Sequence, residues 1–277
     1  MDKGLEGNYI MESDSRPPGT LCLGKGKCML SRLRPTRGRT VRHLTPLALV
    51  LGSTVLAADL LLVAASVLRN YVDAGGAFGF LHRELFDGNK DRTLAELFGN
   101  LQLLVASVLL LWIAAAPARK AERFRDAAVY GAWALVLLAM SADDFFRIHE
   151  EVGRAIDTRL ELPALFGLRS QDLGELLVWA GVAAALGAPL LIAHLISRGR
   201  PRRDSYVFIG LAVLLALFAV GMDMLHFILG DLLPSLALSA MNQLEIAGEL
   251  GAMTLMMVWA VHIFTRPANP AGDDGWL

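Results

Sequence analysis

Acidic residues and histidines lie within or beside the longest apolar segments of this 277-residue chain. They are Asp59, Glu96, Asp143, Asp144, His149, Glu150, Glu175, Asp223, His226, Glu245 and Glu249. A carboxylate in hydrocarbon costs about 2.5 to 3.5 kcal/mol even on a lenient insertion scale, so such residues usually face a bundle interior or a wet cavity and mark function. We therefore interpret them as one functional cluster of ionisable groups.

Helical spacing brings several of these side chains onto common faces. Asp223 and His226 are three residues apart, and Glu245 and Glu249 are four apart, so each pair projects from one side of a helix. Inward carboxylates with a carboxylate-x-x-His motif form metal sites in helix bundles. Oxygen and imidazole donors without thiolates favour Zn, Mn or Fe. We predict a divalent-metal site with ligands from Asp143, Asp144, His149, Asp223, His226 and Glu249.

Two glutamates are candidate general bases for a reaction at that metal. Glu96 and Glu175 stand near the same depth as the predicted ligands, and crowding by like charges favours proton uptake by a carboxylate. The remaining members of the predicted polar cluster are Asp59, Asn100, Arg147, Glu150 and Glu245. Arg147 follows Asp143 and Asp144 by four and three residues, so a simple ion pair explains it equally well.

Helix capping is the alternative explanation for three of the glutamates. Each ends a capping-box pattern at the start of an apolar segment: Thr93 to Glu96, Asp172 to Glu175 and Asn242 to Glu245. Capping alone explains these three as well as a site does. Asp143 and Asp223 carry more weight, because they fall in the last turns of their predicted helices, where the dipole disfavours negative charge.

The elements that must position these groups are transmembrane helices. The chain is 55% hydrophobic, with a mean hydropathy of +0.47, and its apolar runs are each long enough for a hydrocarbon core of roughly 30 Å. We predict an all-α polytopic membrane protein, a six-helix bundle over residues 43–266 with spans at 45–68, 95–116, 127–149, 174–196, 206–228 and 241–264. A basic disordered tail, 1–42, and a short tail, 267–277, flank the bundle.

Basic residues predict the orientation of the bundle. Lys and Arg gather before the first span, between the second and third, and between the fourth and fifth. The positive-inside rule then predicts that both termini lie in the cytoplasm. We expect the bundle to lie in the cytoplasmic (inner) membrane. In that orientation the acidic cluster lies in the outer half of the bilayer, while Leu135 to Met140 and Leu211 to Phe218 make the inner half apolar.

Several other activities find no support in the sequence. Cys22 and Cys28 fit no standard metal or redox motif, and HEEVG has Gly153 where a zincin helix needs its second histidine. No G-x-S-x-G elbow and no P-loop occur. We expect no nucleic-acid partner, because the orientation of the bundle in the membrane already explains the basic residues of the N-terminal tail. Met29 is an alternative start of the chain.

These patterns leave three functions open. The first is metal-dependent chemistry on a lipid or a periplasmic small molecule that enters from the outer leaflet. The second is proton- or cation-coupled transport or conduction along the same carboxylates, with Gly187 to Pro189 as a possible helix break. The third is an assembly surface for a partner subunit. The apolar inner half favours the first, since a transport path must cross the whole core.

Overall fold

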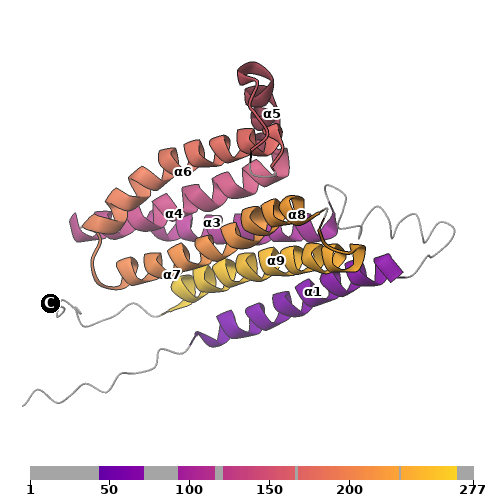
Figure 1. Cartoon of the computed structure of the whole chain (residues 1–277). Helices are drawn as coiled ribbons and strands as arrows, with labels where there is room; N and C mark the ends of the chain where they lie inside the picture. The colour runs from indigo at the N-terminus through magenta and orange to yellow at the C-terminus, as the bar shows by residue number, and fades with distance from the viewer. Residues whose placement is uncertain (1–43, 72–92, 116–120, 166–167, 231, 267–277) are drawn as a thin grey trace, which may run out of the picture. The chain divides into compact units, whose positions relative to one another are not determined.

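The computed structural model describes residues 44–71, 93–115, 121–165, 168–230 and 232–266, and the two predicted tails lie outside them. The described chain is helical, with no strand beyond an isolated bridge between Leu165 and Leu168. Its elements (Figure 1) are α1 (Pro46–Tyr71), α3 (Leu94–Ala115), α4 (Ala121–Phe146), α5 (Ile148–Leu160), α6 (Ser170–Ile196), α7 (Gly199–Ala216), the π-helical η1 (Leu217–Met222), α8 (Asp223–Leu229) and α9 (Ser235–Thr265).

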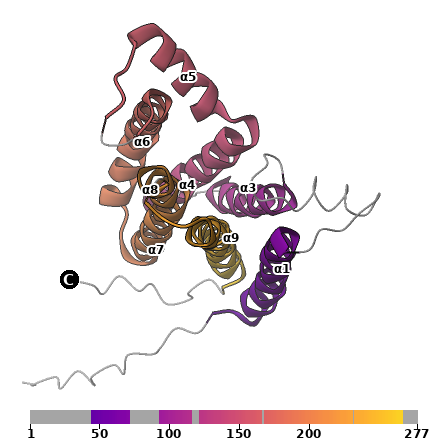
Figure 2. The same cartoon turned by 45° about the vertical axis from the view of Figure 1, so that its right-hand side comes forward.

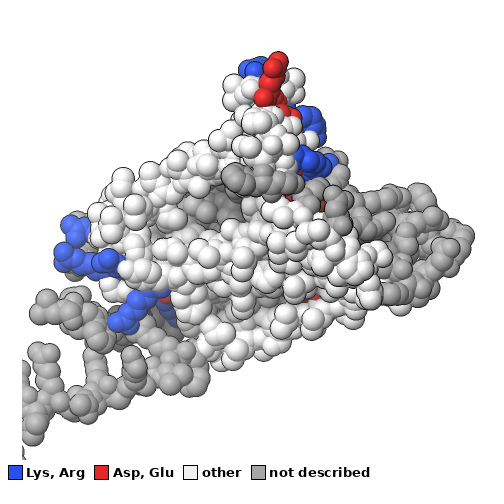
Figure 3. All heavy atoms as spheres, viewed as in Figure 1, with Lys and Arg blue, Asp and Glu red and all other residues white. Residues whose placement is uncertain are grey.

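Six helical segments of the described chain are long and apolar enough to cross a membrane, which confirms the prediction of an all-helical chain with six candidate spans. They are Pro46–Leu68, Leu94–Ala115, Phe124–Phe146, Ser170–Ile196, Gly199–His226 and Ser235–Thr265. On the face shown in Figure 3, uncharged residues cover the described helices between charges at α5 and charges at the opposite end. Such a belt suits lipid, where charged side chains are costly.

α9 is the central helix of the bundle. It packs against α1, α3, α7 and η1, while α3 also packs against α4, and α4 against α6 and α7 (Figure 2). α9 is also the most buried span, whereas α6 is the most exposed. Transmembrane helices associate through close packing and interhelical hydrogen bonds rather than through water exclusion, so α9 holds the other helices in register.

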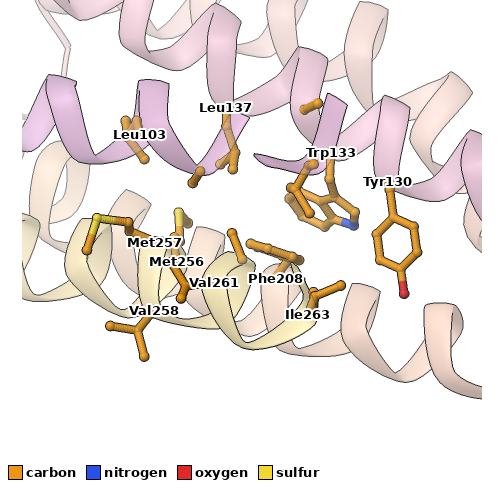
Figure 4. Close-up of a cluster of buried hydrophobic side chains, with 14 of the residues drawn as sticks. Leu103, Tyr130, Trp133, Leu137, Phe208, Met256, Met257, Val258, Val261 and Ile263 are labelled. Atoms are coloured by element: carbon orange, nitrogen blue, oxygen red, sulfur yellow. The ribbon is translucent and has the colours of Figure 1, made fainter. Parts of the chain in front are cut away.

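An apolar core fills the middle of the bundle. Leu103, Trp133, Leu137, Phe208 and Met256 are among its buried side chains (Figure 4). The rings of Trp133 and Phe208 stack with centroids 5.2 Å apart. Packing at this density leaves few voids larger than a water molecule, so the core separates the two ends of the bundle.

The end of the bundle opposite α5 is tied by buried polar contacts. The hydroxyl of Tyr130 donates to Oδ2 of Asp204 at 2.7 Å, and Arg266 donates to Oδ1 of Asp204 at 3.0 Å. The indole Nε1 of Trp133 donates to Oγ of Ser205 at 2.8 Å. Burial lowers the pKa of Arg266, but its contacts with Asp204 and Tyr130 outweigh burial and raise it above the usual value. These contacts join α4, α7 and the end of α9.

Two helix boundaries differ from the predicted ones at residues with unusual or restricted backbone dihedral angles. The third span ends at Phe146 rather than at 149, because Arg147 adopts a left-handed conformation with φ of 55° and α5 begins directly after it. The last span begins at Ser235 rather than 241, directly after Pro234, whose fixed φ suits a helix start. α5 was not predicted as a helix from the sequence.

The irregular point of the bundle is not where the sequence placed it. α6 runs unbroken from Ser170 to Ile196 through Pro189. The fifth span instead changes to a π-helical segment at Leu217–Met222, immediately before Asp223. Segments of this kind are rare and are frequently found at functional sites.

Candidate functional pocket

A pocket of about 780 Å³ opens among α3, α4, α5, α6, α8, α9 and η1 at the α5 end of the bundle. Ten of the residues predicted for the polar cluster line it: Glu96, Asp144, Arg147, His149, Glu150, Glu175, Asp223, His226, Glu245 and Glu249. The side chains come from helices far apart in the sequence and meet in one space. A volume of this size is typical of small-ligand sites.

Asp143 lies behind the pocket wall and orients His149, which lines the pocket. Oδ2 of Asp143 is 2.8 Å from Nδ1 of His149, and Oδ1 accepts the backbone N–H of His149 at 2.9 Å. Burial lowers the pKa of His149, but the hydrogen bond and charge of Asp143, with the charges of Glu150 and Glu175, outweigh burial and raise it above the ordinary value. Nε2 of His149 makes no hydrogen bond with the described residues, which leaves this atom available to a ligand.

The start of α5 changes the interpretation of Asp143. We expected its carboxylate at the unfavourable end of a continuous helix, but α4 ends at Phe146 and Asp143 accepts the backbone N–H of His149 in the first turn of α5. A helix N-terminus favours negative charge. Arg147 donates to Glu150 through Nε at 2.8 Å.

Carboxylates from four helices surround Glu249 of α9. The charges of Glu245, Asp144, Asp223 and Glu96 all act on it. Glu249 is largely buried, and no hydrogen bond or ion pair within the described residues reaches Glu245 or Glu249. Like charges at this depth repel one another and are poorly solvated, so this part of the pocket favours a positive ligand or bound protons.

Asn100 supports this acidic region from behind. Its side-chain amide donates to Asp144, and Ser141 donates to the backbone oxygen of Asn100 at 3.2 Å. The side-chain oxygen of Asn100 is buried and accepts no hydrogen bond from the described residues. An acceptor buried without a donor is costly, and this one lies beside the pocket-lining carboxylate of Asp144.

Two arginines of the rim were missed by the sequence analysis. Arg169 and Arg154 line the pocket where α6 begins and where α5 passes over it. Arg169 donates from Nη2 to Oδ1 of Asp172 at 2.7 Å, and this hydrogen bond with Asp172 raises the pKa of Arg169 despite the opposing effect of burial. Both arginines stand outside the apolar segments, where charged residues are common and give no signal.

The three predicted capping boxes have three different outcomes. At α3 the backbone N–H of Glu96 donates to Oγ1 of Thr93 at 3.3 Å, so capping is present. At α6 the cap lies three residues earlier, since Asp172 accepts the N–H of Arg169 at 2.8 Å. Glu175 instead accepts from Gln171 at 2.8 Å. At α9 the helix begins seven residues before Asn242, so Asn242 and Glu245 lie within it and cap nothing.

Glycines allow the helices around the pocket to approach closely. A Cβ on Gly174 of α6 would lie 2.3 Å from the carbonyl oxygen of Gly153 of α5. A Cβ on Gly248 would lie 2.2 Å from the ring of Phe218 in the π-helical segment. The contact of Gly174 with Gly153 brings α5, which carries His149, close to α6, which carries Glu175. The contact of Gly248 with Phe218 brings η1 close to α9 next to Glu249.

Asp59 lies outside the pocket in a separate buried group. Its Oδ1 accepts from Nε2 of Gln102 at 2.9 Å, and its Oδ2 is bonded to Thr254. Oγ1 of Thr254 also lies 2.8 Å from Oε1 of Gln102. The three side chains join α1, α3 and α9, so Asp59 contributes to helix packing and not to the pocket wall.

Five of the six predicted metal ligands line the pocket, but they do not form a preorganised ion site. Among the described residues, no group of three or more His, Cys, Asp or Glu side chains is placed to hold one metal ion. Asp143 is engaged by His149, while Asp144, Asp223, His226 and Glu249 line the pocket. Binding a metal would require these donors to move together.

Fold and site together define a multi-pass helical membrane protein with an acidic pocket at one end of its bundle. The chain belongs to the family described as Domain of unknown function (DUF8692), whose model matches residues 29–263. That match covers every helix described above except the last two residues of α9. Searches of the curated proteins and of the solved structures found no match.

Proposed function

We propose that the pocket is a cation-binding active site, in which His149 exchanges protons with a bound small molecule or lipid headgroup. The observation that carries the proposal is the Asp143–His149 pair, held at 2.8 Å, in which His149 lines a pocket where Glu245 and Glu249 have no hydrogen bond or ion pair within the described residues. With Nδ1 on Asp143, the neutral imidazole offers Nε2 as a base. The carboxylates bind the positive part of the ligand.

The charge balance of the pocket supports a cationic ligand. Its lining contains seven carboxylates, which are Glu96, Asp144, Glu150, Glu175, Asp223, Glu245 and Glu249, and three arginines. Two of the arginines pair with residues at the rim, Arg154 with Glu151 at 3.2 Å and Arg169 with Asp172 at 2.7 Å. The deeper carboxylates keep their negative charge or take up protons.

A divalent metal is one candidate for the bound cation. Zn, Mn or Fe would be bound by Asp144, Asp223, His226 and Glu249, and His149 would act beside the metal. Glu96 or Glu175 would then serve as a second proton acceptor. The spread of the donors in the described residues favours a larger ligand over a single small ion.

Proton- or cation-coupled transport is the second candidate. The π-helical segment beside Asp223 supports it, since transporters bind ions at interrupted helices. The apolar core of Leu103, Leu137 and Phe208 supports a closed site instead, because it gives an ion no polar path toward the opposite end. Cation uptake into proteoliposomes, lost in Glu249→Gln, would favour transport.

The proposed location is the cytoplasmic membrane with both termini inside. In this orientation the pocket opens toward the outer leaflet, and the basic ends of α6 and α7 face the cytoplasm. The ligand then comes from the outer leaflet or from the space outside it.

Thermal unfolding of the purified protein in detergent tests the proposal. Mn²⁺, Zn²⁺, Mg²⁺ and small organic amines are added separately to wild type, Glu249→Gln and the control Glu151→Gln. At a concentration one hundred times the Kd, a ligand that binds only the folded state stabilises by about 2.7 kcal/mol. We expect at least one cation to raise Tm in wild type and in the control, and less in Glu249→Gln. If no cation raises Tm in wild type, the proposal is wrong.

A further inference from the structure

The groups around the pocket that lack partners within the described residues are hydrogen-bond acceptors. They are the carboxylates of Glu245 and Glu249 and, in the neutral imidazole, Nε2 of His149, all from residues of the pocket lining. Acceptors are satisfied only by donors, and charge-assisted N–H bonds are the strong ones. The complementary ligand must therefore bring N–H or O–H groups as well as positive charge.

The lining also shows which cation suits the pocket poorly. Its described residues include no Phe, Tyr or Trp. Quaternary ammonium groups have no N–H to donate and are recognised by aromatic cages. The pocket offers carboxylates in place of rings, so it favours a primary or secondary ammonium.

Acidic groups in the pocket are spread along its depth. Glu245 and Glu249 stand on successive turns of α9, separated by a rise of about 6 Å. Asp223, on α8, acts electrostatically on both of them. A single monovalent ion would neutralise only one of these three carboxylates, whereas a ligand with two separated ammonium groups would contact carboxylates at both positions.

Apolar side chains of α9 lie between and below these carboxylates. Ile246, Leu250 and Met253 line the pocket on the helix that carries Glu245 and Glu249. They provide contact area for methylene groups, and the flexible thioether of Met253 adapts to the shape of such a chain. A ligand that alternates ammonium groups with short alkyl segments fits both kinds of surface.

From this combination we propose that the pocket binds an aliphatic di- or polyamine through ammonium groups on Glu245, Glu249 and Asp223, with its alkyl chain on Leu250 and Met253. This inference rests on the proposed cation-binding function and names its ligand class. His149 then lies where it can accept a proton from one of the bound ammonium groups. Salt weakens the interaction less than at a surface, because the carboxylates are largely buried.

Calorimetric titration of the full chain in detergent at low ionic strength tests the ligand class. The probes are 1,4-diaminobutane, butylamine, the bis-trimethylammonium analogue of the diamine, and Mg²⁺. We expect the diamine to bind at least tenfold more tightly than each of the other three, since it alone offers two charged N–H donors. Equal affinity for the bis-quaternary analogue would overturn the proposal, because charge alone would then explain binding.

Variants locate the diamine within the pocket. Glu249→Gln should weaken the diamine about tenfold or more, while Glu151→Gln, an exposed residue outside the lining, should leave its affinity unchanged. Unchanged diamine affinity in Glu249→Gln would also overturn the proposal. If Mg²⁺ binds in a Glu249-dependent manner while the diamine does not, this ligand class is wrong and the cation-binding function stands. If none of the cations binds wild type, both fail.

Discussion

Asp143 holds His149 at two points, through its imidazole Nδ1 at 2.8 Å and its backbone N–H at 2.9 Å. The side chain of Asp143 is almost fully buried, whereas His149 reaches the pocket. One carboxylate therefore positions the ring, keeps the proton on Nδ1 and stabilises the imidazolium. This arrangement suits a histidine that accepts protons better than one that only stabilises the fold.

Asp143→Asn tests the electrostatic role of this carboxylate. The substitution keeps the shape but removes the charge, so the pKa of His149 should fall. NMR titration of the histidine resonances measures the change. Glu151→Gln is the matched control, because Glu151 is exposed and pairs with Arg154. An unchanged pKa in Asp143→Asn would show that Asp143 does not control the proton on His149.

The same pair predicts a pH dependence of stability. The pKa of His149 is raised in the folded protein above 6.5, so its contribution is fully present below that value and is lost as pH rises through the folded pKa. A charged hydrogen bond exceeds a neutral one by about 1 kcal/mol, which corresponds to about 2 to 4 °C in Tm. Wild type should lose this much more than His149→Gln between about pH 6 and pH 9 in thermal unfolding. Parallel pH profiles would contradict the prediction.

The contact of α5 with α6 predicts opposite effects for two glycines of one helix. Gly174→Ala places a Cβ 2.3 Å from the carbonyl oxygen of Gly153, and overpacking of this kind costs about 1 to 3 kcal/mol. Gly181→Ala is the control, because a Cβ there meets nothing within 4 Å and alanine is the better helix former. Thermal unfolding should show a lower Tm for Gly174→Ala only. Equal Tm values would mean that α5 does not pack this closely.

Tyr130→Phe should separate stability from ligand binding. The change removes hydrogen bonds of 2.7 Å to Asp204 and 2.8 Å to Arg266 at the end opposite the pocket. We expect a loss of about 1 to 3 kcal/mol in stability, with unchanged cation affinity in calorimetric titration. A change in affinity would show that the apolar core transmits structure between the two ends.

Cysteine labelling tests the proposed orientation. Glu161→Cys reports on the connection between α5 and α6, and Arg198→Cys on the connection between α6 and α7, each in a chain with Cys22 and Cys28 replaced by serine. A membrane-impermeant maleimide should label the first variant in intact cells and the second only after permeabilisation. The reverse pattern would invert the topology and place the pocket on the cytoplasmic side.

Local sequence predicts the membrane-spanning helices well because lipid leaves few alternatives. A run of about 20 apolar residues must satisfy its backbone hydrogen bonds internally, and a helix does so within one segment. The six predicted spans therefore match six observed helical segments, with ends that differ by a few residues. The largest differences lie at the starts of the last two spans, which begin at Gly199 rather than 206 and at Ser235 rather than 241.

Capping patterns were weaker guides to the site. Thr93 caps α3 as its pattern predicts. The pattern at Asn242 is present without a cap, because the helix extends past it to Ser235. Since Glu245 then has no capping role, its place in the pocket follows from the packing of α9 and not from the local motif.

The chain by itself determined that buried carboxylates exist at one level of six helices, since their cost in lipid turns them away from it. Only the tertiary structure decided which of them meet. Asp59 joins Gln102 and Thr254, whereas Glu249 faces Asp144 and Asp223. The difference depends on the rotation and register of each helix, which are set by close contacts between distant segments such as that of Gly248 with Phe218.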